Sequence, residues 1–170
     1  MFSWFGKVGF TPATRVAGFA AHLKDGRIMA SRCRACDAQA FPPRADCDAC
    51  LSPDFEWVEI SGRGTVHTFT TIVAAPAGFE RDAPYTVGVV DLEEGGRALA
   101  WFGDSIAPAA IAIGMPVQLV PRIEEDGEAI RVVYAIEPAG TTWFKAAAEA
   151  EGGAMTGVAT SGGAGEGRAT

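Results

Sequence analysis

Two C-x-x-C motifs in the stretch CRACDAQAFPPRADCDAC constrain this chain more than any other feature. The stretch holds all four cysteines of the 170-residue sequence, and ten residues separate the two motifs. Two such motifs can present four thiolates tetrahedrally to one metal ion. We therefore predict a metal site whose ligands are Cys33, Cys36, Cys47 and Cys50.

The alternatives to a zinc site are two disulfides, four free thiols or an iron centre. A cytoplasmic location disfavours disulfides, and the paired spacing argues against free thiols. Four cysteine ligands leave no open position for a substrate, so the site would be structural. Iron would make a rubredoxin-like electron carrier, but rubredoxins usually carry glycine after the second cysteine of each motif. Asp37 and Leu51 stand at those positions here, which favours zinc.

Charge and hydrophobicity limit the classes of protein to which the chain can belong. No stretch approaches the roughly 20 apolar residues of a membrane-spanning helix. The start, MFSWFGKVGF, lacks the order of a secretory signal, so we expect a cytoplasmic protein. Residues 1–50 hold seven basic and four acidic residues, whereas residues 51–170 hold seven basic and seventeen acidic residues. The acidic part repels nucleic acid, so an anionic ligand should prefer the N-terminal third.

A short helix is predicted ahead of the cysteines. Thr11 and Pro12 form a helix start, and Gly26 is suited to its end. Between them, apolar residues recur at helical spacing, at Val16, Phe19, Ala20 and Leu23. The following stretch RIMASRC is expected to be a short strand that leads into the first cysteine pair.

After the last cysteine the pattern becomes that of a β protein. EWVEI and TVHTFTTIVAA are expected to form one long first strand, with Gly62 and Gly64 providing a bend. YTVGVVDL and RALAWFG form a predicted hairpin around the turn EEGG. PVQLVPRI and EAIRVVYAI form another around EEDG, and DSIAPAAIAIG links the two with a short helix. This order favours a five-stranded OB-type barrel, with a small open sandwich as the alternative.

The predicted organisation has four parts. They are a helical segment at residues 1–27, a zinc ribbon at 28–54, an OB-fold barrel at 55–138, and a C-terminal helix and glycine-rich tail at 139–170. Residues 151–170 contain seven glycines and no aromatic residue, so we expect them to be disordered.

The remaining candidates for catalysis are weak. His22 falls near the end of the predicted helix, where a cation is favourable. His67 falls inside a strand with no catalytic partner beside it in the sequence, so we interpret it as structural. The acidic runs fall in predicted turns and are interpreted as solvated.

Taken together, these pieces resemble a family of small bacterial and archaeal proteins. Its members join an N-terminal helix and a rubredoxin-like zinc ribbon to an OB-fold, long catalogued as a domain of unknown function. The resemblance covers roughly residues 12–138 and is carried by CRACDAQAFPPRADCDAC, GRGTVHTFT, PYTVGVVDL and IGMPVQLV. The chain departs from the family at Asp37 and Asp48, where glycine and proline are frequent, and at His67, which is usually aromatic.

The resemblance implies a non-catalytic accessory subunit with structural Zn²⁺. Such subunits form hetero-oligomers with thiolase-superfamily enzymes (thiolases, acyltransferases or aldolases) that act on acyl-CoA thioesters. They can also help to bind CoA in a cleft between ribbon and barrel. A nucleic-acid-binding zinc-ribbon/OB protein and an iron electron carrier are the alternatives.

Four arginines are candidates for contacts with the CoA phosphates, because a guanidinium matches the geometry of a phosphate. They are Arg32, Arg34, Arg44 and Arg63. The alternative is that these arginines are solvated or pair with Asp25, Asp37 and Asp46.

Overall fold

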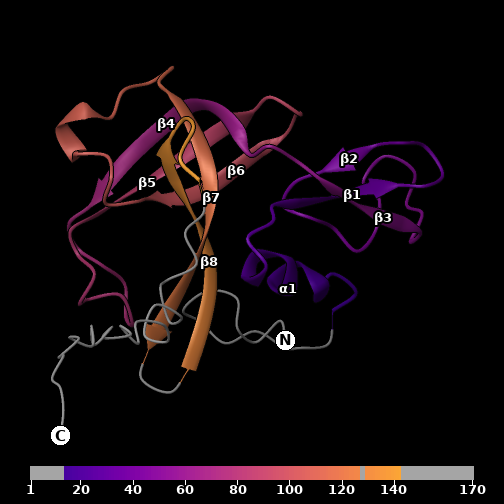
Figure 1. The fold of residues 1–170 in the computed structure, drawn as a ribbon, viewed down its shortest axis with the longest axis horizontal. Helices are drawn as coiled ribbons and strands as arrows, with labels where there is room; N and C mark the ends of the chain where they lie inside the picture. The colour runs from indigo at the N-terminus through magenta and orange to yellow at the C-terminus, as the bar shows by residue number, and fades with distance from the viewer. Residues whose placement is uncertain (1–13, 127–128, 143–170) are drawn as a thin grey trace, which may run out of the picture.

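The computed structural model of this chain describes residues 14–126 and 129–142 (Figure 1). In chain order the elements are α1 (Gly18–Lys24), β1 (Met29–Cys33), β2 (Gln39–Ala40), β3 (Phe55–Glu59), β4 (Arg63–Ile72), β5 (Tyr85–Leu92), β6 (Arg97–Phe102), the 3₁₀ turn η2 (Pro108–Ala110), β7 (Pro116–Asp126) and β8 (Ala129–Pro138). The helix start predicted at Thr11–Pro12 lies outside the described residues. So do the tail and all but the first residues of the predicted C-terminal helix.

Five strands form a closed barrel in the order β4-β5-β6-β8-β7. This confirms the predicted five-stranded barrel and excludes the open sandwich. Neighbouring strands are antiparallel except β6 and β8, which pair in parallel. Along β5, half-buried and buried residues alternate without a break, because one face of the strand lies in the core.

The first barrel strand, β4, pairs with two neighbours, and glycines lie where these pairings begin. Gly64 lies opposite Leu92 of β5 and also opposite Val117 of β7. A Cβ atom on Gly64 would lie 2.2 Å from the carbonyl oxygen of Asp91, so only glycine fits there. Gly62, with a φ of +69°, redirects the chain just before the strand. We expected both glycines inside one long first strand, but Gly62 lies between β3 and β4, and only Gly64 lies within a barrel strand.

The stretch EWVEI belongs to a different sheet from the one that we expected. It lies in β3, which pairs with β1 in the three-stranded sheet β2-β1-β3. The prediction that it opens the first barrel strand is therefore wrong, because the chain turns at Gly62 and barrel pairing starts at Arg63. The two-residue strand β2 was not predicted, whereas β1 confirms the strand expected in RIMASRC.

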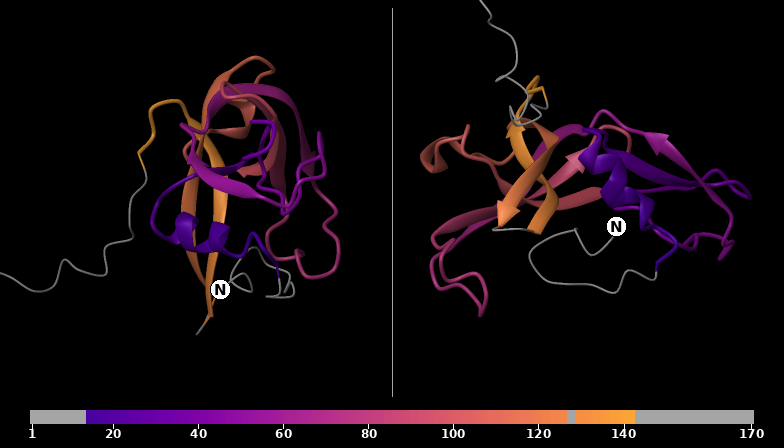
Figure 2. Two further views of the ribbon diagram at one scale, coloured as in Figure 1. Left: turned by 90° about the vertical axis from the view of Figure 1, so that its right-hand side faces the viewer. Right: turned by 60° about the horizontal axis from the view of Figure 1, so that its bottom comes forward.

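Helix α1 joins the small sheet to the barrel through three aromatic rings. The ring of Phe19 lies edge-on to Phe41 at 6.0 Å and to Tyr134 of β8 at 6.2 Å. Burial raises the pKa of Tyr134 to about 12. Phe19, Ala20 and Leu23 are buried, as the helical spacing predicted, and they share one core with the barrel. Figures 1 and 2 show α1 lying beside β7 and β8.

Two linking segments differ in length from the prediction. The helix expected in DSIAPAAIAIG is only the 3₁₀ turn η2, since the backbone is already extended at Ala107 and Ile111 on either side. Strand β7 continues through the predicted turn EEDG as far as Asp126, which pairs with Ala129. Within the described ranges, α1 is far too short to cross a membrane.

Candidate metal centre

The four cysteines lie in two turns that repeat the same backbone geometry. In the first turn the N–H of Asp37 donates to the carbonyl of Cys33, and in the second the N–H of Leu51 donates to the carbonyl of Cys47. In each turn the N–H of the first cysteine also donates to the carbonyl five residues later. This repeated pattern folds each C-x-x-C motif so that both of its sulfurs face the other motif.

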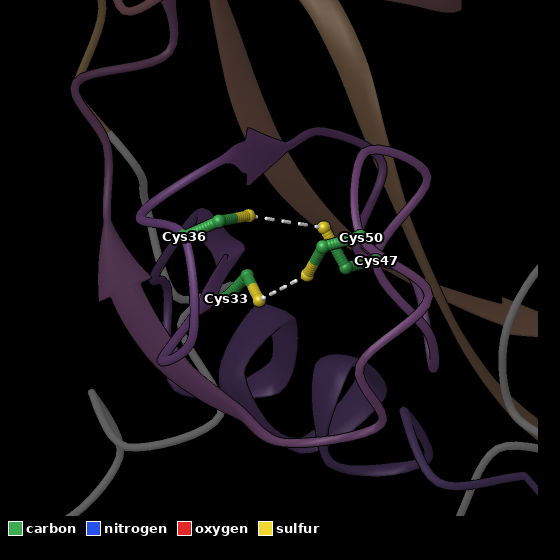
Figure 3. Close-up of side chains that lie close together, drawn as sticks. All are labelled: Cys33, Cys36, Cys47 and Cys50. Atoms are coloured by element: carbon green, nitrogen blue, oxygen red, sulfur yellow. Dashed lines mark hydrogen bonds between the residues drawn. The ribbon is translucent and has the colours of Figure 1, made fainter.

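The sulfur atoms of these cysteines form one cluster, and Figure 3 shows the side chains pointing toward one another. All four Sγ atoms lie within 4.8 Å of one another. The Sγ atoms of Cys33 and Cys50 are 3.5 Å apart, and those of Cys36 and Cys47 are 3.6 Å apart. A disulfide bond is only about 2.05 Å long, so these thiols are not bonded to each other. Zn–S bonds of about 2.3 Å in a tetrahedron hold sulfurs about 3.8 Å apart, so the cluster fits one zinc ion.

The pKa values of the clustered thiols also favour binding of a cation. Burial raises the pKa of the Cys33 thiol, but the N–H groups of Ala35 and Cys36 outweigh it and bring this pKa to about 7. The N–H of Ala38 lowers the pKa of Cys36, but the neighbouring sulfurs outweigh that effect and raise it to about 12. The geometry therefore favours a thiolate at Cys33 and disfavours one at Cys36. A divalent cation removes this repulsion and allows all four thiols to ionise.

The residue after each second cysteine has a left-handed backbone conformation. The φ angle is +58° at Asp37 and +60° at Leu51. Glycine adopts this conformation without strain, whereas a Cβ atom makes it unfavourable. The Leu51 side chain is 81% exposed, so little packing offsets the strain.

Three of the four candidate arginines form ion pairs within the ribbon. Arg32 and Arg34 both contact Glu56, and the hydrogen bonds from Arg32 hold the pKa of that carboxyl below its usual range. Arg44 pairs with Asp48, four residues later. Ion pairing, the alternative to phosphate binding, thus describes these three arginines, although their acidic partners are not those that we weighed.

The fourth arginine, Arg63, is exposed and has no ion pair with another described residue. It lies on a cleft of about 370 Å³ at the junction of the small sheet and the barrel. The cleft is lined by residues 26, 28, 59–61, 63, 118–121 and 140–142. Gln118 holds two of its walls together, because its Nε2 donates to the carbonyl of Ser61 and its Oε1 accepts from the N–H of Gly140. The structure thus separates Arg63 from the other three candidates.

His67 has a partner that the sequence reasoning missed. The pairing of β4 and β5 shifts register between Val66 and Thr68, and the Nδ1 of His67 lies 2.8 Å from the Oδ2 of Asp91. Arg97 donates to the other oxygen of this carboxylate at 2.6 Å, and both contacts hold the pKa of Asp91 below its usual range. The His67 side chain is 43% exposed on the outside of the barrel, which is consistent with a structural role. No signal in the sequence could have found this pair, because His67 falls at the register shift and Asp91 lies opposite Thr65.

His22 lies in the last turn of α1, where the sequence placed it. Its ring contacts Trp57 of β3 edge-on at 5.1 Å. Burial, and then the charge of Arg27, lower the pKa of His22 below 6.5. The position predicted for His22 is therefore correct, and burial disfavours the cationic form that a helix end alone would favour.

Comparison with known proteins assigns a family to both halves of this arrangement. Residues 20–56 match the model of the ChsH2 rubredoxin-like zinc ribbon domain, and residues 57–122 match the model of the ChsH2 C-terminal OB-fold domain. The two matches meet between Glu56 and Trp57, inside β3. The matched zinc ribbon contains all four clustered cysteines.

Three similar proteins illustrate the range of the family. A DUF35 domain-containing scaffold protein of Methanocaldococcus jannaschii is 36% identical over 116 residues, which are 66% of this chain and 82% of that protein. The benzoylsuccinyl-CoA thiolase subunit BbsA of Thauera aromatica is 34% identical over 79 residues, which are 45% of this chain and 54% of BbsA. A chain of a solved structure described as "Ltp2-ChsH2(DUF35) aldolase" is 32% identical, with a TM-score of 0.62 over 76% of this chain and 99% of that one.

The two family models agree with the geometry. One describes a zinc ribbon where the four thiols converge, and the other describes an OB-fold where the closed barrel lies. The family suggested by the sequence motifs is thereby confirmed. The chain belongs to the DUF35 family of proteins, which join a ChsH2-type rubredoxin-like zinc ribbon to an OB-fold domain.

Proposed function

We propose that this chain is a non-catalytic accessory subunit of a thiolase-superfamily enzyme (a thiolase, an acyltransferase or an aldolase) that acts on acyl-CoA thioesters. One observation carries the proposal, which is the similarity to almost the whole of a chain from the Ltp2-ChsH2(DUF35) aldolase structure. BbsA, a relative with a different reaction, is named as a subunit of a thiolase. The two names belong to different reactions, an aldolase and a thiolase, so the similarity favours a shared supporting role rather than one reaction.

The chemistry of the described residues is compatible with a supporting role. All four thiols converge on one cluster, where four-cysteine coordination leaves no open position on a metal. The imidazole of His67 is bound to a carboxylate that Arg97 also uses, and it lies on an exposed barrel face. Both groups thus serve the structure of the chain.

The metal in this proposal is Zn²⁺, with Cys33, Cys36, Cys47 and Cys50 as its ligands. The ion would supply positive charge and cross-link the two turns, without taking part in catalysis. Backbone N–H groups of Ala35 and Ala49 lie 3.4 Å from the sulfurs of Cys33 and Cys47, so each turn also donates to its first cysteine.

A contribution to CoA binding is the finer part of the proposal, and Arg63 is its best candidate. It is the candidate arginine that carries no ion pair with a described residue, and it borders the cleft between ribbon and barrel. Replacing Arg63 with alanine should weaken CoA binding by the complex at least about tenfold, because a hydrogen bond to a charged group contributes about 1.5–3 kcal/mol. The matched control is Arg34→Ala, which removes an arginine that Glu56 already neutralises. Equal CoA affinity in wild type and Arg63→Ala would contradict this assignment.

The accessory role is tested by purifying the tagged chain from its native cells at moderate salt. We expect one larger thiolase-superfamily protein to elute with it in a fixed stoichiometry, identified by mass spectrometry. Zinc should be present in the same fraction, measured by atomic emission. Elution with nucleic acid in place of an enzyme would overturn the proposal, and a red ferric chromophore would indicate the electron carrier.

A further inference from the structure

The four clustered cysteines differ in how far solvent reaches them. Cys36 and Cys50, the second cysteine of each motif, are exposed, whereas Cys33 is buried and Cys47 is half-buried. The sequence contains no further cysteine, so every thiol of the chain belongs to this cluster. Oxidation of cysteine follows exposure and thiolate character. An oxidant that reacts with thiols therefore meets Cys36 and Cys50 first.

Beside each exposed sulfur lies a less exposed thiol of the other motif. The Sγ atom of Cys36 lies 3.6 Å from that of Cys47, and the Sγ atom of Cys50 lies 3.5 Å from that of Cys33. Figure 3 marks both contacts with dashed lines, and each joins one motif to the other. A disulfide is about 2.05 Å long, so each pair of sulfurs needs to approach by only about 1.5 Å to form one. Each thiol that an oxidant reaches thus has a second thiol placed to react with it.

We propose that the cysteine cluster is a site of reversible oxidation by a hydroperoxide. The products are the two disulfides that join the motifs, Cys36–Cys47 and Cys33–Cys50. This inference goes beyond the proposed function, because it depends on the positions of the four sulfurs and not on the partner of the chain.

Each disulfide forms in two balanced steps. The thiolate of the exposed cysteine attacks one oxygen of hydrogen peroxide, so the O–O bond breaks, an S–O bond forms, and hydroxide leaves and takes up a proton. The thiolate of the neighbouring cysteine then attacks the sulfenic sulfur, so the S–O bond breaks, the S–S bond forms, and a second hydroxide leaves as water. Two thiols and one hydrogen peroxide thus give one disulfide and two water molecules. The sulfurs are oxidised and the peroxide oxygens are reduced.

Oxidation in this pattern removes the metal ligands but keeps the ribbon cross-linked. A metal ion is bound by thiolates, and the disulfides leave none in the cluster. The two disulfides still join the turn at residues 33–36 to the turn at residues 47–50, close to the separation that the sulfurs already have. Reduction therefore returns four thiols to positions from which they bind a metal again, which makes the oxidation reversible.

The test treats the full chain, loaded with zinc, with hydrogen peroxide until N-acetylcysteine in a parallel sample is fully oxidised. Free thiols are counted with a chromogenic disulfide, and released zinc is measured with a coloured chelator. The thiol count should fall from four per chain to fewer than about one, with loss of the bound zinc. Dithiothreitol should then restore all four thiols, and added zinc should bind again.

Peptide mapping identifies the partners of each cysteine. Cleavage after arginine separates the two motifs at Arg44 and the two cysteines of the first motif at Arg34. Cleavage before aspartate separates the two cysteines of the second motif at Asp48. Mass spectrometry of the unreduced peptides should therefore find the two disulfides that we propose and distinguish them from every other pairing.

Two cysteine variants form a matched pair. Cys33→Ser leaves Cys50 without its neighbour, and Cys47→Ser leaves Cys36 without its neighbour. A sulfenic acid should then persist on that exposed cysteine and be trapped by dimedone, whereas the wild type should give no adduct. Because each variant also loses a metal ligand, the disulfide map of the wild type decides the proposal where the ribbon of a variant is unfolded.

Three results would overturn this proposal. One is a disulfide within either motif, or between Cys33 and Cys47. Another is sulfinic acid on the exposed cysteines, which dithiothreitol does not reduce. The third is survival of all four thiols after the peroxide treatment. None of these results bears on the accessory role, which the co-purification tests separately.

Discussion

Replacing Leu51 with glycine should stabilise the protein, although it removes a large apolar side chain. Leu51 has a φ of +60° and is 81% exposed, so its side chain contributes strain and little burial. Left-handed backbone costs a residue with a Cβ atom about 1–2 kcal/mol. Glycine relieves that strain but loses about 0.5–1 kcal/mol through its greater freedom in the unfolded chain. The net stabilisation expected for Leu51→Gly is about 0.5–1 kcal/mol.

The matched control is the equivalent residue of the other turn. Asp37 has a φ of +58°, but aspartate adopts the left-handed region more readily than leucine. Asp37→Gly should therefore change stability by less than about 0.5 kcal/mol. The assay is urea unfolding of the zinc-loaded protein under reducing conditions. The slope of the transition should be equal in all variants, which shows that each exposes the same surface on unfolding.

In thermal unfolding, the same gain corresponds to a rise in Tm of about 1–4 °C for a domain of this size. Zinc content must be equal in both variants, since metal loss would mask the backbone effect. A lower unfolding midpoint for Leu51→Gly than for the wild type would refute the reasoning. So would a larger gain for Asp37→Gly than for Leu51→Gly.

Three further predictions concern the metal, the bend and the barrel charges. Cys47→Ser should lose its zinc and unfold the ribbon, because binding free energy at such sites is folding free energy; retained zinc, measured by atomic emission, would count against it. Gly64→Ala should destabilise the protein by about 3 kcal/mol, since its Cβ would lie 2.2 Å from a backbone oxygen. Gly18→Ala, the control, should stabilise α1 by up to about 1 kcal/mol. A urea midpoint for Gly64→Ala at or above that of Gly18→Ala would contradict this. Arg97 and His67 lower the pKa of Asp91 below 3.8, so its contribution to stability is complete above that pH and is lost as pH falls through the lower folded-state value. Asp91→Asn should therefore show less loss of stability between neutral pH and about pH 3 than the wild type, measured by urea midpoints; an unchanged pH dependence would exclude this role.

The features that sequence predicted well depend on local spacing. The two C-x-x-C motifs needed only their own turns to bring four sulfurs within 4.8 Å. The five barrel strands carried period-two alternation, and glycine was needed where β4 approaches the carbonyl of Asp91. For the cysteine turns and the alternation the physical cause acts over a few residues, so the pattern shows it directly.

The features that sequence missed depend on which strands become neighbours. EWVEI alternates in the same way whether it pairs with β1 or enters the barrel, so its sheet could not be read from its pattern. Once β1 and β3 pair, Arg32 lies directly opposite Glu56, which explains an ion pair that no sequence spacing suggested. His67 and Asp91 meet only because β4 and β5 pair with a shift in register at that point.

The burial of His22 was missed for the same reason. Its position near the end of α1 favoured a cation, but Trp57 comes from a strand 35 residues later and covers the ring. Desolvation by such packing is the main cause of the lowered pKa of His22. Local position along the helix could not show this effect.

The most direct measurement of the accessory role is turnover of an acyl-CoA thioester by the separated and recombined proteins. The substrate should be one that the co-purified enzyme accepts, and three samples are compared: this chain alone, the larger subunit alone, and both together. We predict no turnover by the chain alone and a stable complex whose activity or stability exceeds that of the larger subunit alone. Turnover by the purified chain alone, or a larger subunit that neither binds the chain nor changes in its presence, would contradict the proposed function.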